Sequence, residues 1–153
     1  MNRKGFSLIE LLTTVSIIGV LASIALPKYQ ALRKRANAAE IVSAMTTVRA
    51  GAYQYNESIG AWPGTTGLGL VPKGLAQYLP GAGVKMFRGE FHQLGWTLTT
   101  VKGLGNTTQI LSASITDGVV CQATYGLWGG TANKDILGLC GPKGGSIFLW
   151  IDR

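Results

Sequence analysis

The chain opens with a long run of apolar residues that a single charge interrupts. From Phe6 through Leu26 there are 21 residues, and Glu10 is the only one that carries a charge. About 20 apolar residues in a helix are enough to cross a bilayer, so this pattern predicts a membrane-spanning helix. An ionised carboxylate inside hydrocarbon costs about 2 to 3 kcal/mol or more, which indicates that Glu10 has a partner and a purpose.

After Pro27 the apolar pattern changes from an all-round run to a single stripe. Six apolar side chains recur there at alternating steps of four and three: Ile41, Met45, Val48, Ala52, Tyr55 and Ile59. Such steps place side chains on one face of a helix, which is expected to lie on a core. We therefore expect one helix from about Phe6 to Glu57. Pro27 lacks a backbone donor and should kink or loosen it.

Alternation with a period of two dominates the C-terminal third. Four β-rich segments are expected as strands: Trp96–Val101, Gln109–Thr116, Val119–Tyr125 and Ser146–Ile151. Turns at residues 103–106 and at Asp117-Gly118 separate the first three, and the second of these turns is a two-residue hairpin signal. The prediction is an α+β fold, with an antiparallel meander of about four strands packed on the helical stripe, in which the position of the last strand stays open. A Gly- and Pro-rich connection precedes the sheet, with a short helix around residues 75–79.

The first 27 residues resemble the N terminus of type IV prepilins and of the pseudopilins of type II secretion. The resemblance rests on the basic start Met1–Lys4, the Gly5-Phe6 junction, the sequence Phe6-Ser7-Leu8-Ile9-Glu10, and Pro27. It implies that a prepilin peptidase cuts between Gly5 and Phe6 and methylates Phe6. It also implies that Glu10 pairs with the new N terminus of a neighbouring subunit during assembly.

The same resemblance implies a division of the chain into functional parts. Residues 1–5 are the leader peptide, residues 6–27 the transmembrane and filament-core half of the helix, and residues 28–59 the half packed on the sheet. The segment between Gly19 and Pro27 is expected to kink or to loosen within a filament. Residues 60–94 form a variable connecting loop, and residues 95–153 form the sheet with a disulfide-bounded C-terminal loop.

Cys121 and Cys140 are the only cysteines. In an exported domain such a pair is expected to form a disulfide, worth about 3 kcal/mol for a loop of this length. Major secretion pseudopilins typically lack this bridge and carry a calcium site instead. The late acids here, Asp117, Asp135 and Asp152, are too few and too scattered for an oxygen cage. This favours a pilin, with no metal and no cofactor.

Two other interpretations of the N terminus stay open. A secretory signal peptide also begins with basic residues and an apolar run, and Ser23-Ile24-Ala25 is an acceptable cleavage site for one. A plain membrane anchor is the second. The charges also conflict with an exported head, since Arg3 and Lys4 precede the span but four basic residues follow it: Lys28, Arg33, Lys34 and Arg35. The positive-inside rule would place the bulk of the chain in the cytoplasm.

Composition and motifs argue against catalysis. The 153 residues are 46% hydrophobic and 14% charged, with a net charge of +7, which is typical of one folded domain. His92 is the only histidine, and no G-x-S-x-G motif, metal-spaced histidine pair or P-loop accompanies it. We therefore expect a protein that is not an enzyme.

The resemblance implies a structural subunit of a type IV pilus-like filament, a homopolymer served by prepilin peptidase and an inner-membrane assembly platform. The subunit would cross the bacterial inner membrane once, with its N terminus in the cytoplasm, before joining an extracellular pilus or a periplasmic pseudopilus. One alternative is a type II secretion pseudopilin. Another is a minor pilin that binds nucleic acid or a surface through basic residues of the head: Lys73, Lys85, Arg88, Lys102, Lys134 and Lys143.

Overall fold

A computed structural model describes residues 5–100 and 107–151 of the chain. The chain divides into two compact units, Met1–Lys34 and Arg35–Arg153. We call the second unit the head. Several predicted features lie outside the described residues: the basic start Met1–Lys4, Val101, Lys102, the turn at residues 103–106, and Asp152.

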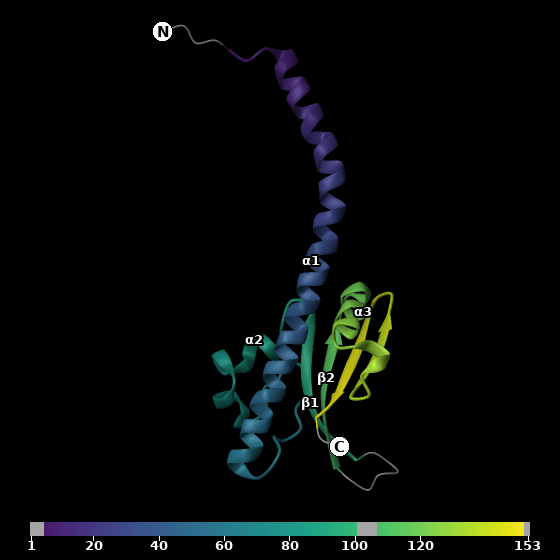
Figure 1. Ribbon diagram of the computed structural model, residues 1–153. Helices are drawn as coiled ribbons and strands as arrows, with labels where there is room; N and C mark the ends of the chain where they lie inside the picture. The colour runs from purple at the N-terminus through teal and green to yellow at the C-terminus, as the bar shows by residue number, and fades with distance from the viewer. Residues whose placement is uncertain (1–4, 101–106, 152–153) are drawn as a thin grey trace. The chain divides into compact units, whose positions relative to one another are not determined.

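A long helix and a four-stranded sheet dominate the secondary structure, which is labelled in Figure 1. The helices are α1 (Leu8–Ile59), η1 (Leu75–Tyr78), η2 (Pro80–Gly83), α2 (Val84–Phe87), α3 (Gly118–Leu127) and η3 (Gly130–Ala132). The strands are β1 (His92–Thr100), β2 (Thr107–Ile115), β3 (Ile136–Gly141) and β4 (Gly144–Trp150). The predicted α+β class is confirmed, and η1 confirms the short helix expected around residues 75–79.

Helix α1 confirms the single long helix, since its 52 residues run without interruption through Pro27. Its residues up to Lys34 belong to the first unit and its residues from Arg35 onward belong to the head. The predicted kink at Gly19 and Pro27 stays a prediction. The side chains before the head are exposed, as Ile17 and Leu26 illustrate at 60% and 58%.

Within the head, α1 buries the predicted stripe. The buried residues of α1 are Ala38, Ile41, Ala44, Met45, Val48, Gly51 and Ala52. Tyr55 is partly buried against the same core, whereas Ile59 is 57% exposed, so its assignment to the stripe was wrong. Ile59 is the last residue of α1, and the chain turns at Gly60 with a φ of 76°, so the helix ends before this side chain meets the core.

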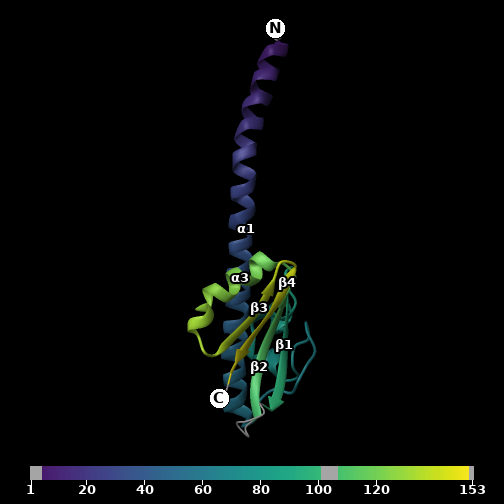
Figure 2. The ribbon, with the colours of Figure 1, turned by 90° about the vertical axis from the view of Figure 1, so that its right-hand side faces the viewer.

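The sheet is antiparallel throughout, but its strand order is β1-β2-β4-β3. Strand β4 lies beside β2, where the predicted meander had residues 119–125, so the meander was wrong. Register pairs Trp96 with Leu111 and Leu111 with Leu149, which continues one apolar row across three strands. Figure 2 shows the four strands side by side, with the head portion of α1 behind the sheet.

Residues 119–125 form a helix, not the predicted strand. Helix α3 begins at Gly118 because Asp117 is its N-cap, and the Asp117 carboxylate accepts hydrogen bonds from the amides of Val119 and Val120 at 2.8 and 3.1 Å. The Asp117-Gly118 hairpin turn was therefore also wrong. Burial follows a helical spacing, because Val120, Cys121 and Thr124 are buried while Val119 is 56% exposed.

Strand β3 lies at the edge of the sheet, in a segment for which no strand was predicted. It pairs with β4 through a tight connection at Pro142-Lys143, where Gly141 faces Gly144. Cys140 in β3 is joined to Cys121 in α3 by a disulfide, with a Cα–Cα distance of 5.7 Å, as expected from the sequence. The bridge therefore fastens α3 to the edge of the sheet.

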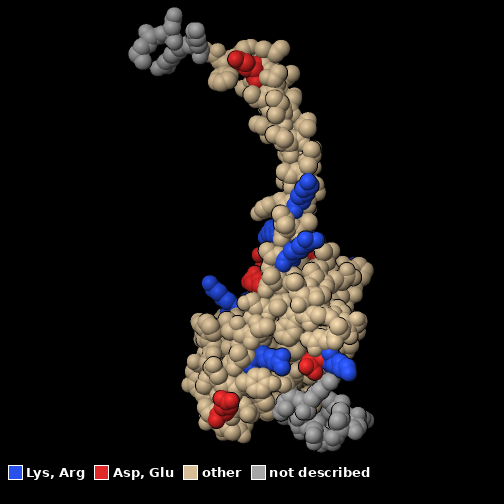
Figure 3. All heavy atoms as spheres, viewed as in Figure 1, with Lys and Arg blue, Asp and Glu red and all other residues tan. Residues whose placement is uncertain are grey.

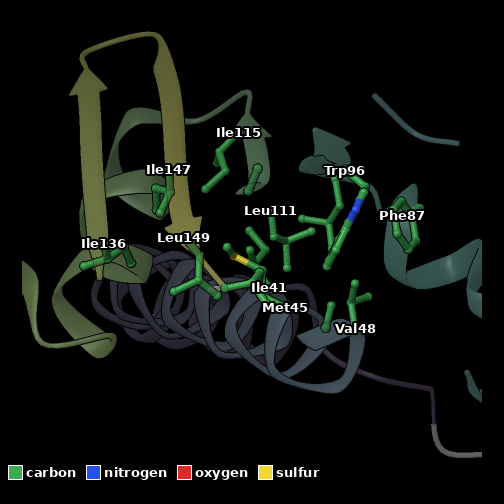
Figure 4. Close-up of a cluster of buried hydrophobic side chains, with 14 of the residues drawn as sticks. Ile41, Met45, Val48, Phe87, Trp96, Leu111, Ile115, Ile136, Ile147 and Leu149 are labelled. Carbon is green, nitrogen blue, oxygen red and sulfur yellow. The ribbon is translucent and has the colours of Figure 1, made fainter. Parts of the chain in front are cut away.

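The core of the head forms where α1 meets the sheet. Figure 4 shows Ile41, Met45 and Val48 of α1 facing the side chains of the strands. The fully buried residues opposite them include Trp96, Leu111, Ile147 and Leu149, and Phe87 of α2 closes one end. Each large apolar side chain removed from water contributes about 1.5 to 3 kcal/mol, so this contact holds the head together.

Candidate functional site

The N-terminal segment places the predicted processing residues just before helix α1. Gly5 and Phe6 precede α1 without regular structure, and Phe6 is 84% exposed. An added Cβ at Gly5 would meet no atom within 4 Å. The bond between Gly5 and Phe6 therefore lies in an exposed stretch without regular structure, which an enzyme can approach.

Glu10 lies in the first turn of α1 and binds the backbone that precedes it. The amide of Ser7 donates a hydrogen bond to Glu10 Oε2 at 2.9 Å, and the Ser7 carbonyl accepts the amide of Leu11 at 3.2 Å. Ser7 followed three residues later by Glu10 has the spacing of a capping box, in which the acid satisfies an amide that the helix leaves without a partner. The carboxylate also lies at the positive end of the helix dipole.

The apolar half of α1 has the properties that a lipid environment requires. An 18-residue window of α1 has a mean hydropathy of 2.1, and none of that window is buried in the protein. The four hydroxyl side chains between Leu8 and Leu26 donate to carbonyls three or four residues earlier: Thr13 to Glu10, Thr14 to Leu11, Ser16 to Leu12 and Ser23 to Val20. Hydroxyls satisfied in this way carry little cost in hydrocarbon.

The basic residues proposed for nucleic-acid binding come from separate segments of the head. Lys73 precedes η1, Lys85 is in α2, Lys134 precedes β3, and Lys143 is in the β3–β4 turn. On the face shown in Figure 3, the blue side chains of the head stand apart from one another. On that face the separated charges form no continuous basic surface along which a phosphate backbone could run.

His92 has a structural place at the start of β1. It is 3% exposed, and its Nε2 lies 3.0 Å from the Met86 carbonyl oxygen, which links β1 to α2. Among residues 5–100 and 107–151 no three histidine, cysteine or carboxylate side chains gather where they could hold a metal ion.

The architecture is that of an α+β protein with a long, apolar N-terminal helix and a four-stranded antiparallel sheet, consistent with the type IV pilin fold. Residues 1–26 match the family model described as the prokaryotic N-terminal methylation motif. No solved structure matches the chain.

Curated relatives point to the same class of protein. The chain is 39% identical over 62 residues to a fimbrial protein of Neisseria meningitidis serogroup B, and the matched segment covers 40% of this chain and 36% of the relative. It is 38% identical over 61 residues to the type IV major pilin protein PilE1 of Neisseria gonorrhoeae, covering 40% and 37%. A fimbrial protein of Pseudomonas aeruginosa is 44% identical over 50 residues, covering 33% and 32%.

The chain thus spans a little over a third of the length of the Neisseria relatives it matches. It carries a prepilin-type methylation motif, and its relatives are type IV pilins and fimbrial proteins. Their names describe structural proteins, which argues against an enzyme. Together with the apolar α1, they favour a membrane-anchored pilin.

Proposed function

We propose that the chain is a pilin, the structural subunit of a type IV pilus-like filament, which prepilin peptidase processes and which polymerises through its apolar N-terminal helix. The observation that supports this most directly is the methylation motif on a helix whose apolar side chains are exposed from Leu8 to Leu32. The relatives are fimbrial proteins and pilins, which favours a pilus over a secretion pseudopilus or a nucleic-acid-binding minor pilin.

Processing changes the chemistry next to Glu10. Cleavage between Gly5 and Phe6 converts the Phe6 amide into an α-amino group, which is a cation near neutral pH. In the uncut chain the Glu10 carboxylate accepts from the Ser7 amide, which is a neutral donor. A cationic donor makes a stronger hydrogen bond, so the methylated N terminus of a neighbouring subunit can compete for the carboxylate.

Assembly then follows from the exposed apolar surface of α1. In the monomer this surface is covered by lipid, and in a filament by the same segment of other subunits. Small residues such as Ser16, Gly19 and Ala22 allow close approach between helices. The platform in the inner membrane would supply subunits oriented with the N terminus in the cytoplasm.

The test is the intact mass and N-terminal sequence of the protein from hosts with and without prepilin peptidase. We expect a mature start at Phe6 that carries one added methyl group, found only when the peptidase is present. A start at Leu26 in both hosts would identify a secretory signal peptide. An uncut chain in both hosts would identify a plain anchor, and either result would refute the proposal.

A further inference from the structure

Four basic residues follow the apolar half of α1 and have no role in processing or in Glu10 pairing. Lys28, Arg33, Lys34 and Arg35 lie within eight positions, and no acidic residue occurs between Glu10 and Glu40. Figure 3 shows blue side chains on α1 after its apolar stretch. In the orientation required by the proposed function these charges lie on the outer side of the membrane, against the usual bias. They therefore need an explanation of their own.

A groove between two helices of the head begins at one of these residues. It is lined by Arg35 and Ala39 of α1 and by Ala123, Gly126 and Leu127 of α3, with a volume of about 410 Å³. Its lining is apolar apart from Arg35, and Leu127 is 59% exposed. A cation beside an apolar trough matches a molecule that carries an anionic group next to a hydrocarbon chain.

We propose that Arg35 and the groove that begins at it dock on anionic phospholipids of the membrane that anchors α1. Lys28, Arg33 and Lys34, which precede Arg35 in the sequence, add to the attraction through their charge. Charge complementarity identifies the headgroup, and the apolar lining identifies the glycerol and upper acyl chain. Proximity in sequence adds to this, because Arg35 follows Leu26, the end of the apolar run, by only nine residues. Basic residues next to a membrane span are attracted by anionic lipid, each by about fivefold in affinity.

Nucleic acid fits these observations less well than lipid does. A phosphate backbone would use the charges, but it would leave the apolar trough beside Arg35 without an occupant. Docking on lipid would hold the head of a stored subunit at the membrane surface, and assembly would then have to release it. The inference rests on the proposed membrane anchoring and on the proposed orientation.

The experiment uses the full chain in nanodiscs of phosphatidylcholine alone or of phosphatidylcholine mixed with the anionic lipid phosphatidylglycerol, which attracts basic residues next to a span. Hydrogen exchange of the α3 amides, residues 118–127, reports on the groove. The test variant is Lys28→Gln/Arg35→Gln. The matched control is Lys134→Gln/Lys143→Gln, which removes the same charge from elsewhere in the head. The affinity for short-chain phosphatidylglycerol is titrated in micelles by native mass spectrometry.

We expect slower exchange in α3 when phosphatidylglycerol is present, for the natural chain and for the control. In the test variant this difference should vanish, and the lipid affinity should fall by about 25-fold for two charges. If the test variant does not fold, the natural chain alone still tests the inference. Equal exchange of α3 in the two lipid compositions would then overturn it.

Other outcomes separate this inference from the proposed function. A chain that fails to enter nanodiscs of either composition contradicts the membrane anchor itself. A chain that enters both and exchanges equally in both overturns only the docking inference. Protection of α3 in phosphatidylcholine discs by inorganic phosphate, or by a short DNA duplex, would also overturn it, because the occupant would then not be a membrane lipid.

Discussion

Under the proposed function Glu10 serves two partners in turn, and the two can be separated by substitution. In the uncut chain its carboxylate accepts from the Ser7 amide at 2.9 Å, a contact that needs an acceptor but no charge. Pairing with an N-terminal ammonium needs the charge. A glutamine at this position keeps the first and loses the second, because Gln also completes a capping box.

We therefore predict that Glu10→Gln and Glu10→Ala are both cleaved after Gly5 but that both lower filament yield about tenfold or more. Loss of a hydrogen bond to a charged group costs about 1.5 to 3 kcal/mol, and tenfold corresponds to about 1.4 kcal/mol. Sheared filaments and the processed monomer are quantified side by side. Exchange of the Ser7 amide should stay slow in Glu10→Gln and become fast in Glu10→Ala. Natural filament yield from Glu10→Gln would show that capping, and not charge, is what assembly requires.

Two glycines of α3 differ sharply in the space around them. An added Cβ at Gly118 would overlap the Gly141 carbonyl oxygen and come within 2.7 Å of the Pro142 carbonyl oxygen. At Gly126 a Cβ would meet no atom within 4 Å. Backbone atoms cannot swing aside as a side chain can, so the first site has no room for alanine.

We predict that Gly118→Ala lowers the stability of the head by about 1 to 3 kcal/mol, as overpacking does. Gly126→Ala should be neutral or stabilising by up to about 1 kcal/mol, because alanine favours a helix. Thermal unfolding of the full chain in detergent, followed by circular dichroism, compares the two. A Tm for Gly118→Ala equal to that for Gly126→Ala would contradict the close approach of α3 to the β3–β4 turn.

Which single residues the sequence could reveal depends on how far away their partners lie. Gly5, Phe6 and Glu10 belong to one continuous motif, so their proposed roles could be taken from the resemblance of that motif to prepilin N termini. The pairing of Cys121 with Cys140 could be inferred because only two cysteines exist. The requirement for Gly118 could not, because the atoms that exclude a side chain belong to Gly141 and Pro142, which are distant in sequence.

At the scale of elements, a capping residue overrode β propensity in α3. Residues 119–125 are rich in types that favour strands, yet the Asp117 carboxylate binds the amides of Val119 and Val120 and starts a helix there. The hydroxyl of the buried Thr124 is satisfied within this helix, because it donates to the Val120 carbonyl at 2.7 Å. Intrinsic strand propensity is weak compared with such context.

We predict that Asp117→Ala destabilises the head by about 1 kcal/mol, within a usual range of about 0.5 to 2 kcal/mol for a lost N-cap. Asp117→Asn, which keeps an acceptor at the same place, should cost much less. Denaturant titration of both variants in detergent, with the disulfide intact, gives the two free energies of unfolding. Equal losses for the two variants would mean that the charge of Asp117, and not its capping hydrogen bonds, stabilises this part of the head.

Long, regular patterns were predictable and short, irregular ones were not. Helix α1 and strands β1, β2 and β4 carry periodic apolar residues over several positions, such as Leu111, Ala113 and Ile115 in β2. Strand β3 has only six residues, and two of them are glycine. Leu137 and Leu139 are exposed, so the sequence of β3 shows no alternation of apolar and polar residues that would predict a strand. Residues 119–125 are not a strand, and β4 lies beside β2 with β3 at the edge, an order that no pattern in the sequence indicated.

At the scale of the whole molecule, helix α1 has two kinds of apolar surface. From Ala38 onward α1 buries a stripe against the sheet, and before that point its apolar side chains are exposed on all sides. Both patterns were legible in the sequence, because a stripe and an all-round run are different signals. The groove at Arg35 could not be predicted from the sequence. Its second wall is α3, and most of that helix was predicted to be a strand.

The exposed apolar half of α1 predicts that the protein is anchored in a membrane. Arginine near the centre of a span costs about 2.5 to 3.5 kcal/mol per residue, so Ile17→Arg/Leu21→Arg should oppose insertion by about 5 to 7 kcal/mol. We expect this variant to be extracted from membranes by alkaline buffer, while the control Ile17→Ala/Leu21→Ala stays in the membrane pellet. Alkylation of thiols provides a second readout. A head that is not exported stays in a reducing compartment, so Cys121 and Cys140 should react in the arginine variant and remain bridged in the control. An arginine variant that stays in the pellet with its disulfide formed would show that α1 does not need an uninterrupted apolar surface to anchor the head outside the cytoplasm.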